Sequence, residues 1–350
     1  MIFIIKNNEP VLISQKKLSA LTIRAFPNVG FNETDADMVA KTLVTTDHMG
    51  ISTHGVLRIE QYLKRVRAGV VQAQPQIEVF DKAPSLAIID GGAGQGQIVA
   101  NRALEIAIIK AKKTGIGFIS IGNSNHFGAT APYGLTATSS GVILIFGTSA
   151  SPSMAPFGGH ELLLGNTPIG FSVPRKGEVP FTPDMALSVA ARRKMLELRD
   201  AGKPMPFGWA LDTEGQPTTD PQAGLNGIIQ FIGGHKGYGI ALAVDILGGL
   251  LSGGRLLNNV GDMWSEKEPQ GVNHISLTLN PAAILGSKIY YERMENFCSK
   301  LKASEPFENS GEVLLPGELE HRTTETRRHD GIPLASELLN TLERLAGTVP

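Results

Sequence analysis

Short apolar runs alternate with longer amphipathic runs through the middle of the chain, and this rhythm constrains the fold more than any other feature. SLAIID (85–90), GFISIG (117–122) and VILIFG (142–147) have the composition of β-strands. IVANRALEIAIIKAKK (98–113) and APYGLTATSS (131–140) lie between and after them as helical runs. Strands that alternate with helices form a sheet with helices packed on it. We therefore expect an α/β protein whose nucleotide-binding core begins near residue 85.

Helical patterns occupy both ends of the chain. The N-terminal ones are QKKLSALTIRAF after Ser14, NETDADMVAKTLVTTDHMG with Asn32 and Asp35 as a capping box, and VLRIEQYLKRVRAG. Near the other end, a charged helix begins at Ser287, a loop carries LLPGELEHR (314–322), and LASELLNTLERLA (334–346) is a last helix. YGIALAVDILGGLLSGG (238–254) is shorter than a membrane span, and we expect it to be a buried helix.

Length and charge narrow the function classes. A chain of 350 residues is long enough for two domains. The formal net charge of −1 provides no field for binding nucleic acid or an anionic membrane, so we expect neither partner. The only cysteine, Cys298, excludes a disulfide framework and fits a reducing, cytoplasmic location. MIFIIK at the start lacks the pattern of a signal peptide and indicates a short strand or tail.

The glycine-rich segment DGGAGQGQ (90–97) resembles a dinucleotide-binding turn without matching it. It follows an expected strand and precedes a helix, but its glycines break the G-x-G-x-x-G spacing, and no acidic residue follows about twenty positions later. The segment is either a glycine turn before a helix or a close contact with a ligand. A Rossmann fingerprint is absent.

The histidines show no metal-binding pattern. They stand at 48, 54, 126, 160, 235, 274, 321 and 329, and none forms H-E-x-x-H or a similar spacing on one helix face. We therefore expect no metal site.

His54 and Arg58 lie together in ISTHGVLR, between two expected helices. The spacing of four allows a general acid/base and a cation to face one pocket. Arginine offers a planar fork for a carboxylate, and histidine can exchange the proton of a substrate hydroxyl. The alternative is that His54 is an ordinary loop residue.

His126 follows an expected strand within GFISIGNSNHFGAT. Ligands bind at strand ends in α/β sheets because the loops there are exposed and rigidly held. The alternative is a helix N-terminus capped by Ser124 or Asn125.

Two further segments suit a nucleotide. In GGHKGYG (233–239), glycines permit close approach of a phosphate, Lys236 offsets its charge, and the next helix presents free amides. PDMALSVAARRKMLELRDAG (183–202) is expected to be a helix with Asp184 at its start, so Asp184 is either an N-cap or a ribose ligand.

Seven segments in order resemble the malate/L-lactate dehydrogenase family that is distinct from the Rossmann-fold dehydrogenases and includes ureidoglycolate, sulfolactate and diketogulonate dehydrogenases or reductases. They are STHGVLR, GFISIGNSNHFGA, APFGGHELLLGNTP, PDMALS, GKPMPFGWALDTEGQPTTDP, GGHKGYGIALAVDILGGLLSG and LLPGE. They span nearly the whole chain. Thr53 stands where serine is usual and keeps the hydroxyl.

The resemblance assigns roles to residues that match the family's motifs. His54 and Arg58 fall in one active-site motif and His126 in another, either histidine being the proton-transferring residue, with His126 preferred. Segments associated with the dinucleotide match Asp184, Met185 and Ala186, then His235, Lys236 and Gly237, then Pro316, Gly317 and Glu318.

The resemblance also implies a fold and an activity. The fold would be a non-Rossmann, mixed-sheet nucleotide-binding domain (81–239) with a helix-rich substrate and dimerisation domain from both chain ends (1–80 plus 240–350). The activity would be hydride transfer between NAD or NADP and a small 2-hydroxy or 2-keto acid, in a cytoplasmic homodimer. Two alternatives remain: an NADPH-dependent cyclic imine reductase of the Δ1-piperideine-2-carboxylate type, or a nucleotide-binding protein without redox activity.

Overall fold

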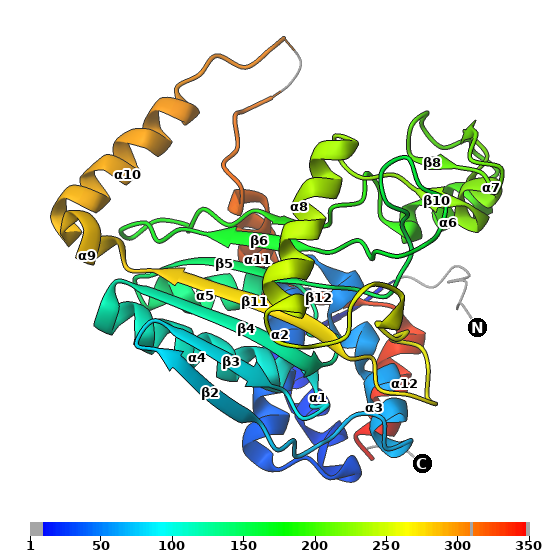
Figure 1. The fold of residues 1–350 in the computed structure, drawn as a ribbon, viewed down its shortest axis with the longest axis horizontal. Coiled ribbons are helices and arrows are strands. Elements are labelled where there is room, and N and C mark those ends of the chain that lie inside the picture. The colour runs from blue at the N-terminus through cyan, green and yellow to red at the C-terminus, as the bar shows by residue number, and fades with distance from the viewer. Residues whose placement is uncertain (1–9, 309–310, 348–350) are drawn as a thin grey trace.

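A computed structural model describes residues 10–308 and 311–347. The expected N-terminal strand or tail, MIFIIK, lies outside the described residues. Three groups of elements make up the described chain: a central sheet with helices on both faces, a helical group from the two chain ends, and a smaller lobe (Figure 1).

The central sheet has seven strands in the order β2-β3-β4-β11-β5-β6-β7. Only β3 and β4 pair in parallel, as the crossover through helix α4 requires, and the other pairs are antiparallel. The sheet is therefore mixed, which confirms the expected α/β class. Its strands are β2 (Glu78–Ala83), β3 (Leu86–Asp90), β4 (Ile116–Ser124), β5 (Ile143–Thr148), β6 (Ile169–Ser172), β7 (Asp184–Met185) and β11 (Val272–Leu279).

The alternation of side chains along β4 decides what covers each face of the sheet. Ile119 and Ile121 pack against helix α4 (Gly96–Thr114), while α5 (Ala131–Ser139) lies beside it. Ser120 points to the opposite face, where it donates to the carbonyl of Leu247 at 2.7 Å. That face is covered by α8 (His235–Asp245) and the π-helical turn Ile246–Leu250 that continues it (Figure 1).

Elements from both chain ends share one hydrophobic core. Strand β1 (Val11–Ile13) pairs with β12 (Ile332–Leu334), and Leu18 and Leu43 are buried in the same cluster as Leu342. The helices of this group are α1 (Gln15–Ala25), α2 (Glu33–His48), α3 (Ile59–Arg67), α11 (Glu318–Asp330) and α12 (Ser336–Leu345), with a 3-10 turn at Pro27–Val29. Asn32 caps α2 by accepting from the amide of Asp35 at 2.9 Å, as the capping box predicts.

Strand β11 lies at the centre of the sheet although it belongs to the 240–350 segment. The C-terminal segment therefore contributes to the sheet as well as to the helical group.

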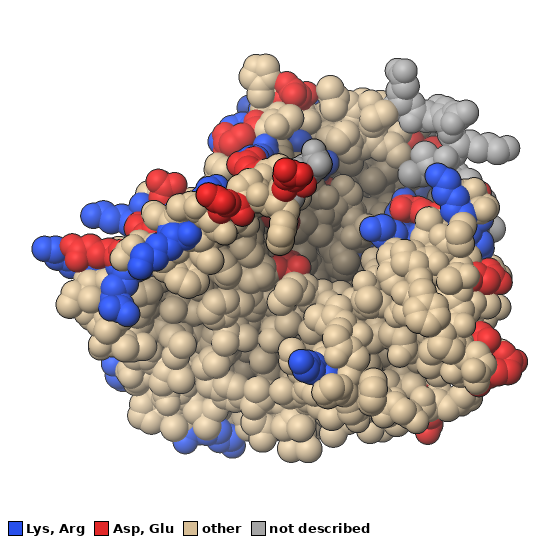
Figure 2. Space-filling model, turned by 90° about the horizontal axis from the view of Figure 1, so that it is seen from above, with Lys and Arg blue, Asp and Glu red and all other residues tan. Residues whose placement is uncertain are grey.

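The lobe follows β7 and has its own small core. It contains α6 (Arg192–Asp200), α7 (Pro221–Asn226) and a three-stranded sheet of β8 (Ala210–Leu211), β9 (Pro217–Thr218) and β10 (Ile228–Ile229). On the other side, α9 (Pro281–Leu285) and α10 (Ser287–Lys302) project from the body (Figure 1). Seen from above, the surface is hollowed between this projection and the lobe (Figure 2).

Three expectations about helices are wrong. The helix expected from Asp184 begins only at Arg192, and LLPGELEHR is not all loop, because α11 begins at Glu318. The helix expected to be buried has one open face, with Ile240, Ile246 and Leu250 44%, 48% and 55% exposed. Among the described residues, none of the helices is long and apolar enough to span a membrane.

Candidate functional site

A tight turn after α2 holds His54 and Arg58. Two 3-10 turns, Ser52–His54 and Val56–Arg58, are joined by Gly55. The carboxylate of Asp47, near the end of α2, accepts a hydrogen bond from the amide of Val56 at 2.7 Å. It lies so close to Gly55 that a Cβ there would collide with it, so only glycine fits. This packing fixes the backbone between His54 and Arg58.

His54 is partly buried and neutral. Its Nδ1 lies within hydrogen-bond distance, 2.9 Å, of the hydroxyl of Thr53. The hydroxyl that threonine shares with the usual serine is therefore in use. Burial, and secondarily the nearby Arg58 guanidinium, lower the pKa of His54 to about 4. At neutral pH the imidazole can therefore accept a proton.

Arg58 presents an unpaired cation. Its Nε donates to the carbonyl of Thr53 at 2.7 Å, and its guanidinium lies over the ring of Trp264, 5.3 Å from the centroid. Its terminal amino groups make no hydrogen bond or ion pair with any described residue. A partly buried guanidinium without an internal partner is suited to an anionic ligand.

His126 lies in the loop after β4, and its ring stacks on that of His54. The centroids are 5.6 Å apart and the ring planes differ by 27°. Its Nδ1 lies 2.6 Å from the hydroxyl of Tyr62, and its amide donates to Oε1 of Gln270 at 2.9 Å. Burial, followed by the charges of His54 and Arg58, lowers the pKa of His126 well below its usual range. The structure thus brings His54, Arg58 and His126 together.

Ser124 and Asn125 do not cap the next helix. Ser124 lies 2.8 Å from Nε2 of the buried His274, whose Nδ1 is 2.7 Å from the hydroxyl of Thr148. The amide of Asn125 donates to the carbonyls of Ala93 and Gly94, and its oxygen accepts from Arg65. These bonds hold the His126 loop rigidly against the glycine-rich segment 91–96.

The carboxylate of Asp184 caps helix α5. It accepts hydrogen bonds from the amides of Thr130 and Ala131 at 2.9 and 3.0 Å. Asp184 is thus a capping residue, but for a helix distant in sequence and not for one that it begins. Met185 and Ala186 follow at the edge strand, and Met185 is exposed.

The turn before α8 leaves an open, positively charged helix end. Gly233 and Gly234 have φ angles of 59° and 60°, and no side chain caps the helix. His235 and Lys236 are exposed, Gly237 is buried, and Lys236 makes no ion pair with the described residues. An exposed glycine turn beside an unpaired lysine suits a phosphate group, although the amides of Gly234, Lys236 and Gly237 already donate to backbone carbonyls.

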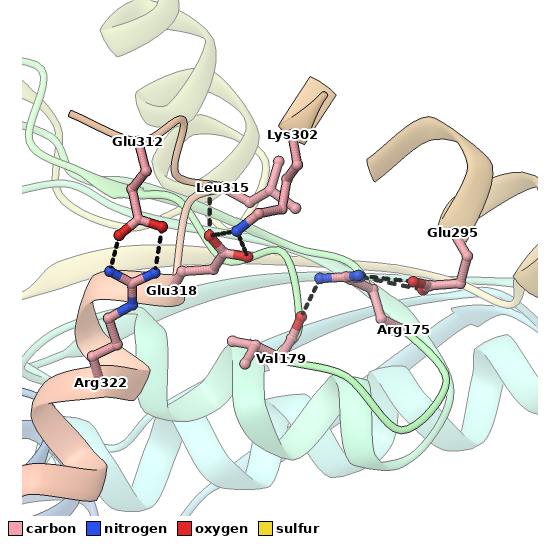
Figure 3. A network of polar contacts seen from close by, with 8 residues as sticks. All are labelled: Arg175, Val179, Glu295, Lys302, Glu312, Leu315, Glu318 and Arg322. Carbon is pink, nitrogen blue, oxygen red and sulfur yellow. Dashed lines mark hydrogen bonds and ion pairs between the residues drawn. The ribbon is translucent and has the colours of Figure 1, made fainter. Parts of the chain in front are cut away.

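Pro316 and Gly317 form the turn that precedes α11, and Glu318 is the first residue of that helix. The carbonyl of Pro316 accepts from the amide of Thr182 at 2.9 Å. Glu318 pairs with Lys302 of α10 at 2.7 Å and accepts from the amide of Leu315 (Figure 3). Its carboxylate is therefore already engaged.

The three expected cofactor segments adjoin one another at the β7 edge of the sheet. Before β7, the amide of Thr182 donates to the carbonyl of Pro316. After β7, the carbonyl of Leu187 accepts from the amide of Ile232 at 2.9 Å, and Ile232 directly precedes the glycine turn. Through Asp184 and Thr130, this edge is also joined to the loop that carries His126. The exposed glycine turn and Lys236 fit a dinucleotide diphosphate.

Sequence reasoning missed Tyr62, Gln97, Gln270, Trp264 and Asp47. Tyr62 could have been found, because it lies four residues after Arg58 in an expected helix. Gln270 and Trp264 give no local signal, since only the folded chain brings their loop to the site. Among the described residues, no cluster of three or more His, Cys, Asp or Glu side chains could hold a metal ion.

Two stacked neutral imidazoles beside an unpaired arginine have the chemistry to move a proton on an anionic ligand. Comparison with known proteins then shows the family. The family model described as malate/L-lactate dehydrogenase matches residues 13–343, and this chain belongs to that family, as the sequence resemblance predicted.

Relatives match along nearly their whole length. Malate dehydrogenase from Pyrococcus abyssi is 35% identical over 97% of this chain and 95% of the relative. "(2R)-3-sulfolactate dehydrogenase (NADP(+))" from Chromohalobacter salexigens is 35% identical over 91% of each chain. "Ureidoglycolate dehydrogenase (NAD(+))" from Escherichia coli is 29% identical over 94% of each chain.

Solved structures agree with the fold. Sulfolactate dehydrogenase from Methanocaldococcus jannaschii superposes with a TM-score of 0.91 at 33% identity, covering 97% of both chains. Δ1-Piperideine-2-carboxylate reductase from Pseudomonas syringae superposes with a TM-score of 0.86 at 26% identity, covering 96% of this chain and 99% of that chain.

Proposed function

We propose that Arg58 binds the carboxylate of a small 2-hydroxy or 2-keto acid while His126 exchanges a proton with the substrate oxygen. The observation that carries this proposal is the unpaired guanidinium of Arg58 beside two stacked, neutral histidines. His54 is the second candidate for the proton transfer, since it lies in the same pocket.

The class of reaction follows from family membership. The chain is an NAD(P)-dependent oxidoreductase acting on a hydroxy acid. The nicotinamide supplies or accepts the hydride when it is bound. The protein's own part is to bind the carboxylate, to exclude water, and to accept the hydroxyl proton on a neutral imidazole during oxidation or return it during reduction.

We propose that the dinucleotide lies along the β7 edge. The exposed side chain of Lys236 would hold the diphosphate at the glycine turn, with His235 and Gly237 in the same turn. Asp184, Met185 and Ala186 would line the site, with Pro316, Gly317 and Glu318 beside them. Glu318 would act by fixing the turn, because its carboxylate already pairs with Lys302.

A substrate and cofactor panel tests this function. Oxaloacetate, pyruvate, sulfopyruvate, ureidoglycolate and a cyclic imine acid are each assayed with both cofactors. Oxidation of NADH or NADPH by a 2-keto acid, or NAD(P) reduction by ureidoglycolate, is the expected result. The cyclic imine is the second candidate substrate, supported by the piperideine-carboxylate reductase neighbour. If neither cofactor changes fluorescence on titration, the chain binds a different ligand and the proposal fails.

We further propose a cytoplasmic homodimer. The exposed apolar face of α8 and its π-helical turn, with Ile240, Ile246 and Leu250, supports association, since a large open apolar face favours a partner. Light scattering at micromolar concentration measures the mass, and a monomer would contradict the dimer. The proposed division is a nucleotide-binding part of residues 81–239 and a helix-rich part of residues 1–80 plus 240–350, although β11 of the second part lies in the central sheet.

A further inference from the structure

Tyr62 makes the shortest polar contact to the proposed proton-transferring histidine. It lies one turn into α3 after Arg58, its side chain is buried, and its hydroxyl is 2.6 Å from Nδ1 of His126. The rings are tilted by 43° with centroids 6.0 Å apart, so they meet through the hydroxyl rather than by stacking. Burial raises the pKa of Tyr62 to about 12, and the phenol keeps its proton at neutral pH.

Gln97 fixes the direction of this hydrogen bond. Its Nε2 lies 3.4 Å from the Tyr62 oxygen and can only donate to it, because an amide nitrogen has no acceptor. Its Oε1 accepts from Gln95 Nε2 at 2.6 Å, which holds the amide in that orientation. Since Gln97 offers no acceptor here, Nδ1 of His126 is the only acceptor among the described residues within hydrogen-bond distance of the phenol, and the phenol directs its proton there.

We propose that Tyr62 is a positioning residue that sets the tautomer and the ring orientation of His126. A neutral imidazole that accepts at Nδ1 must carry its proton on Nε2. No described residue bonds to that nitrogen. Nε2–H is therefore the donor that remains for the carbonyl oxygen of a 2-keto acid. As that proton moves to the substrate oxygen, the phenol proton of Tyr62 moves to Nδ1, so the imidazole stays neutral, and oxidation runs the same two transfers in reverse.

The inference rests on the proposed role of His126, and the variants are chosen to separate the two. Tyr62→Phe removes only the hydroxyl. Tyr133→Phe is the matched control, because Tyr133 is also buried and its hydroxyl donates to a backbone carbonyl, that of Phe127, at 2.8 Å. His126→Asn tests the proposed function itself.

Steady-state kinetics of the full-length protein in the reducing direction provide the first readout. Tyr62→Phe should lower kcat about 10- to 100-fold, with KM changed less than about threefold, because the imidazole loses its tautomer without loss of the carboxylate anchor. The pH dependence of kcat/KM should shift, while Tyr133→Phe keeps the wild-type values. If His126→Asn is inactive and Tyr62→Phe matches wild type, the inference alone is overturned. If His126→Asn is fully active, the proposed function fails with it.

The tautomer can also be read in the unmodified protein, which covers the case that Tyr62→Phe does not fold. Long-range proton–nitrogen spectra of 15N-histidine-labelled protein distinguish a protonated from an unprotonated ring nitrogen, and the His126→Asn spectrum assigns the signals. Nε2 protonated and Nδ1 unprotonated at neutral pH is the expected pattern. The reverse pattern would refute the inference.

Discussion

The rings of His54 and His126 lie nearly parallel, 5.6 Å apart, although His54 precedes β3 in the chain and His126 follows β4. Their proximity makes a second positive charge costly, because each lies near the other and near Arg58. Near neutral pH both imidazoles are therefore uncharged.

The two histidines should respond differently to replacement. His126→Asn should lower kcat by about 10²- to 10⁴-fold, the range for a general acid/base, whereas His54→Asn should lower it less. Separate kcat and KM values for the two variants decide the assignment. Equal, wild-type turnover in both would show that neither histidine transfers the proton.

Arg58 should govern substrate affinity. Arg58→Met leaves the carboxylate without its cation and should lower kcat/KM roughly 100-fold or more, mostly through KM. Arg58→Lys keeps the positive charge but loses the planar guanidinium that can donate two hydrogen bonds to one carboxylate. It should therefore recover only part of the substrate affinity. Trp264→Phe keeps an aromatic face on the guanidinium and is the control with a small effect. An unchanged KM in Arg58→Met would place the carboxylate elsewhere.

Asp184 should stabilise the fold by capping α5, a helix about fifty residues before it in the chain. Asp184→Ala leaves the amides of Thr130 and Ala131 without their acceptor and should lower the free energy of unfolding by about 1 to 2 kcal/mol. Chemical denaturation measures this loss. Asp220→Ala, which removes the cap of the peripheral helix α7, is a matched control. If Asp220→Ala lowers the free energy of unfolding while Asp184→Ala leaves it unchanged, the cap of α5 is not stabilising.

Asp47 should make the protein less stable as the pH rises toward neutrality. Burial raises its pKa from 3.8 to about 7 in the folded protein, so below pH 4 both states are protonated and its contribution is full. Between about pH 4 and 7 only the unfolded chain ionises, and stability falls by up to about 1.4 kcal/mol per pH unit. Asp47→Asn should remove this slope. Denaturation at pH 5 and pH 8 measures the free energy of unfolding of both proteins. Wild type should lose stability relative to Asp47→Asn between the two pH values, and a constant difference would contradict the raised pKa.

His274 should make the protein less stable as the pH falls, the opposite pH dependence to that of Asp47. Burial lowers its pKa from 6.5 to about 3, so its contribution is complete above pH 6.5 and is lost as the pH falls toward 3. His274→Gln should be destabilising at neutral pH, with a penalty that shrinks as the pH falls from 6.5 to 4. Exposed His329, replaced by Gln, provides the control. A penalty independent of pH would show that His274 titrates normally when folded.

Periodicity predicted the three strands and the helices around them, because side-chain alternation and helix caps are local. The helix expected from Asp184 failed because distant backbone groups bind its first residues: Leu187 donates to Asn166, and Val189 donates to Gln230. Such bonds compete with helical ones and leave no local trace. The pairing of His54 with His126 is of the same kind. Motif resemblance named both residues, but only the fold brings their rings together.

The pairing of β1 with β12 also governs the order in which the protein can fold. Val11 to Ile13 meet Ile332 to Leu334, and the core around Leu18 and Leu43 includes Leu342. On the ribosome, the first helices to emerge therefore lack part of their core until almost the entire chain has been translated. The local β3–α4–β4 crossover can assemble earlier, and the whole sheet can form once β11 (Val272–Leu279) has been made, still before β12. Synthesis and folding thus run in different directions: the chain is made from one end, but its structure closes from the middle outward.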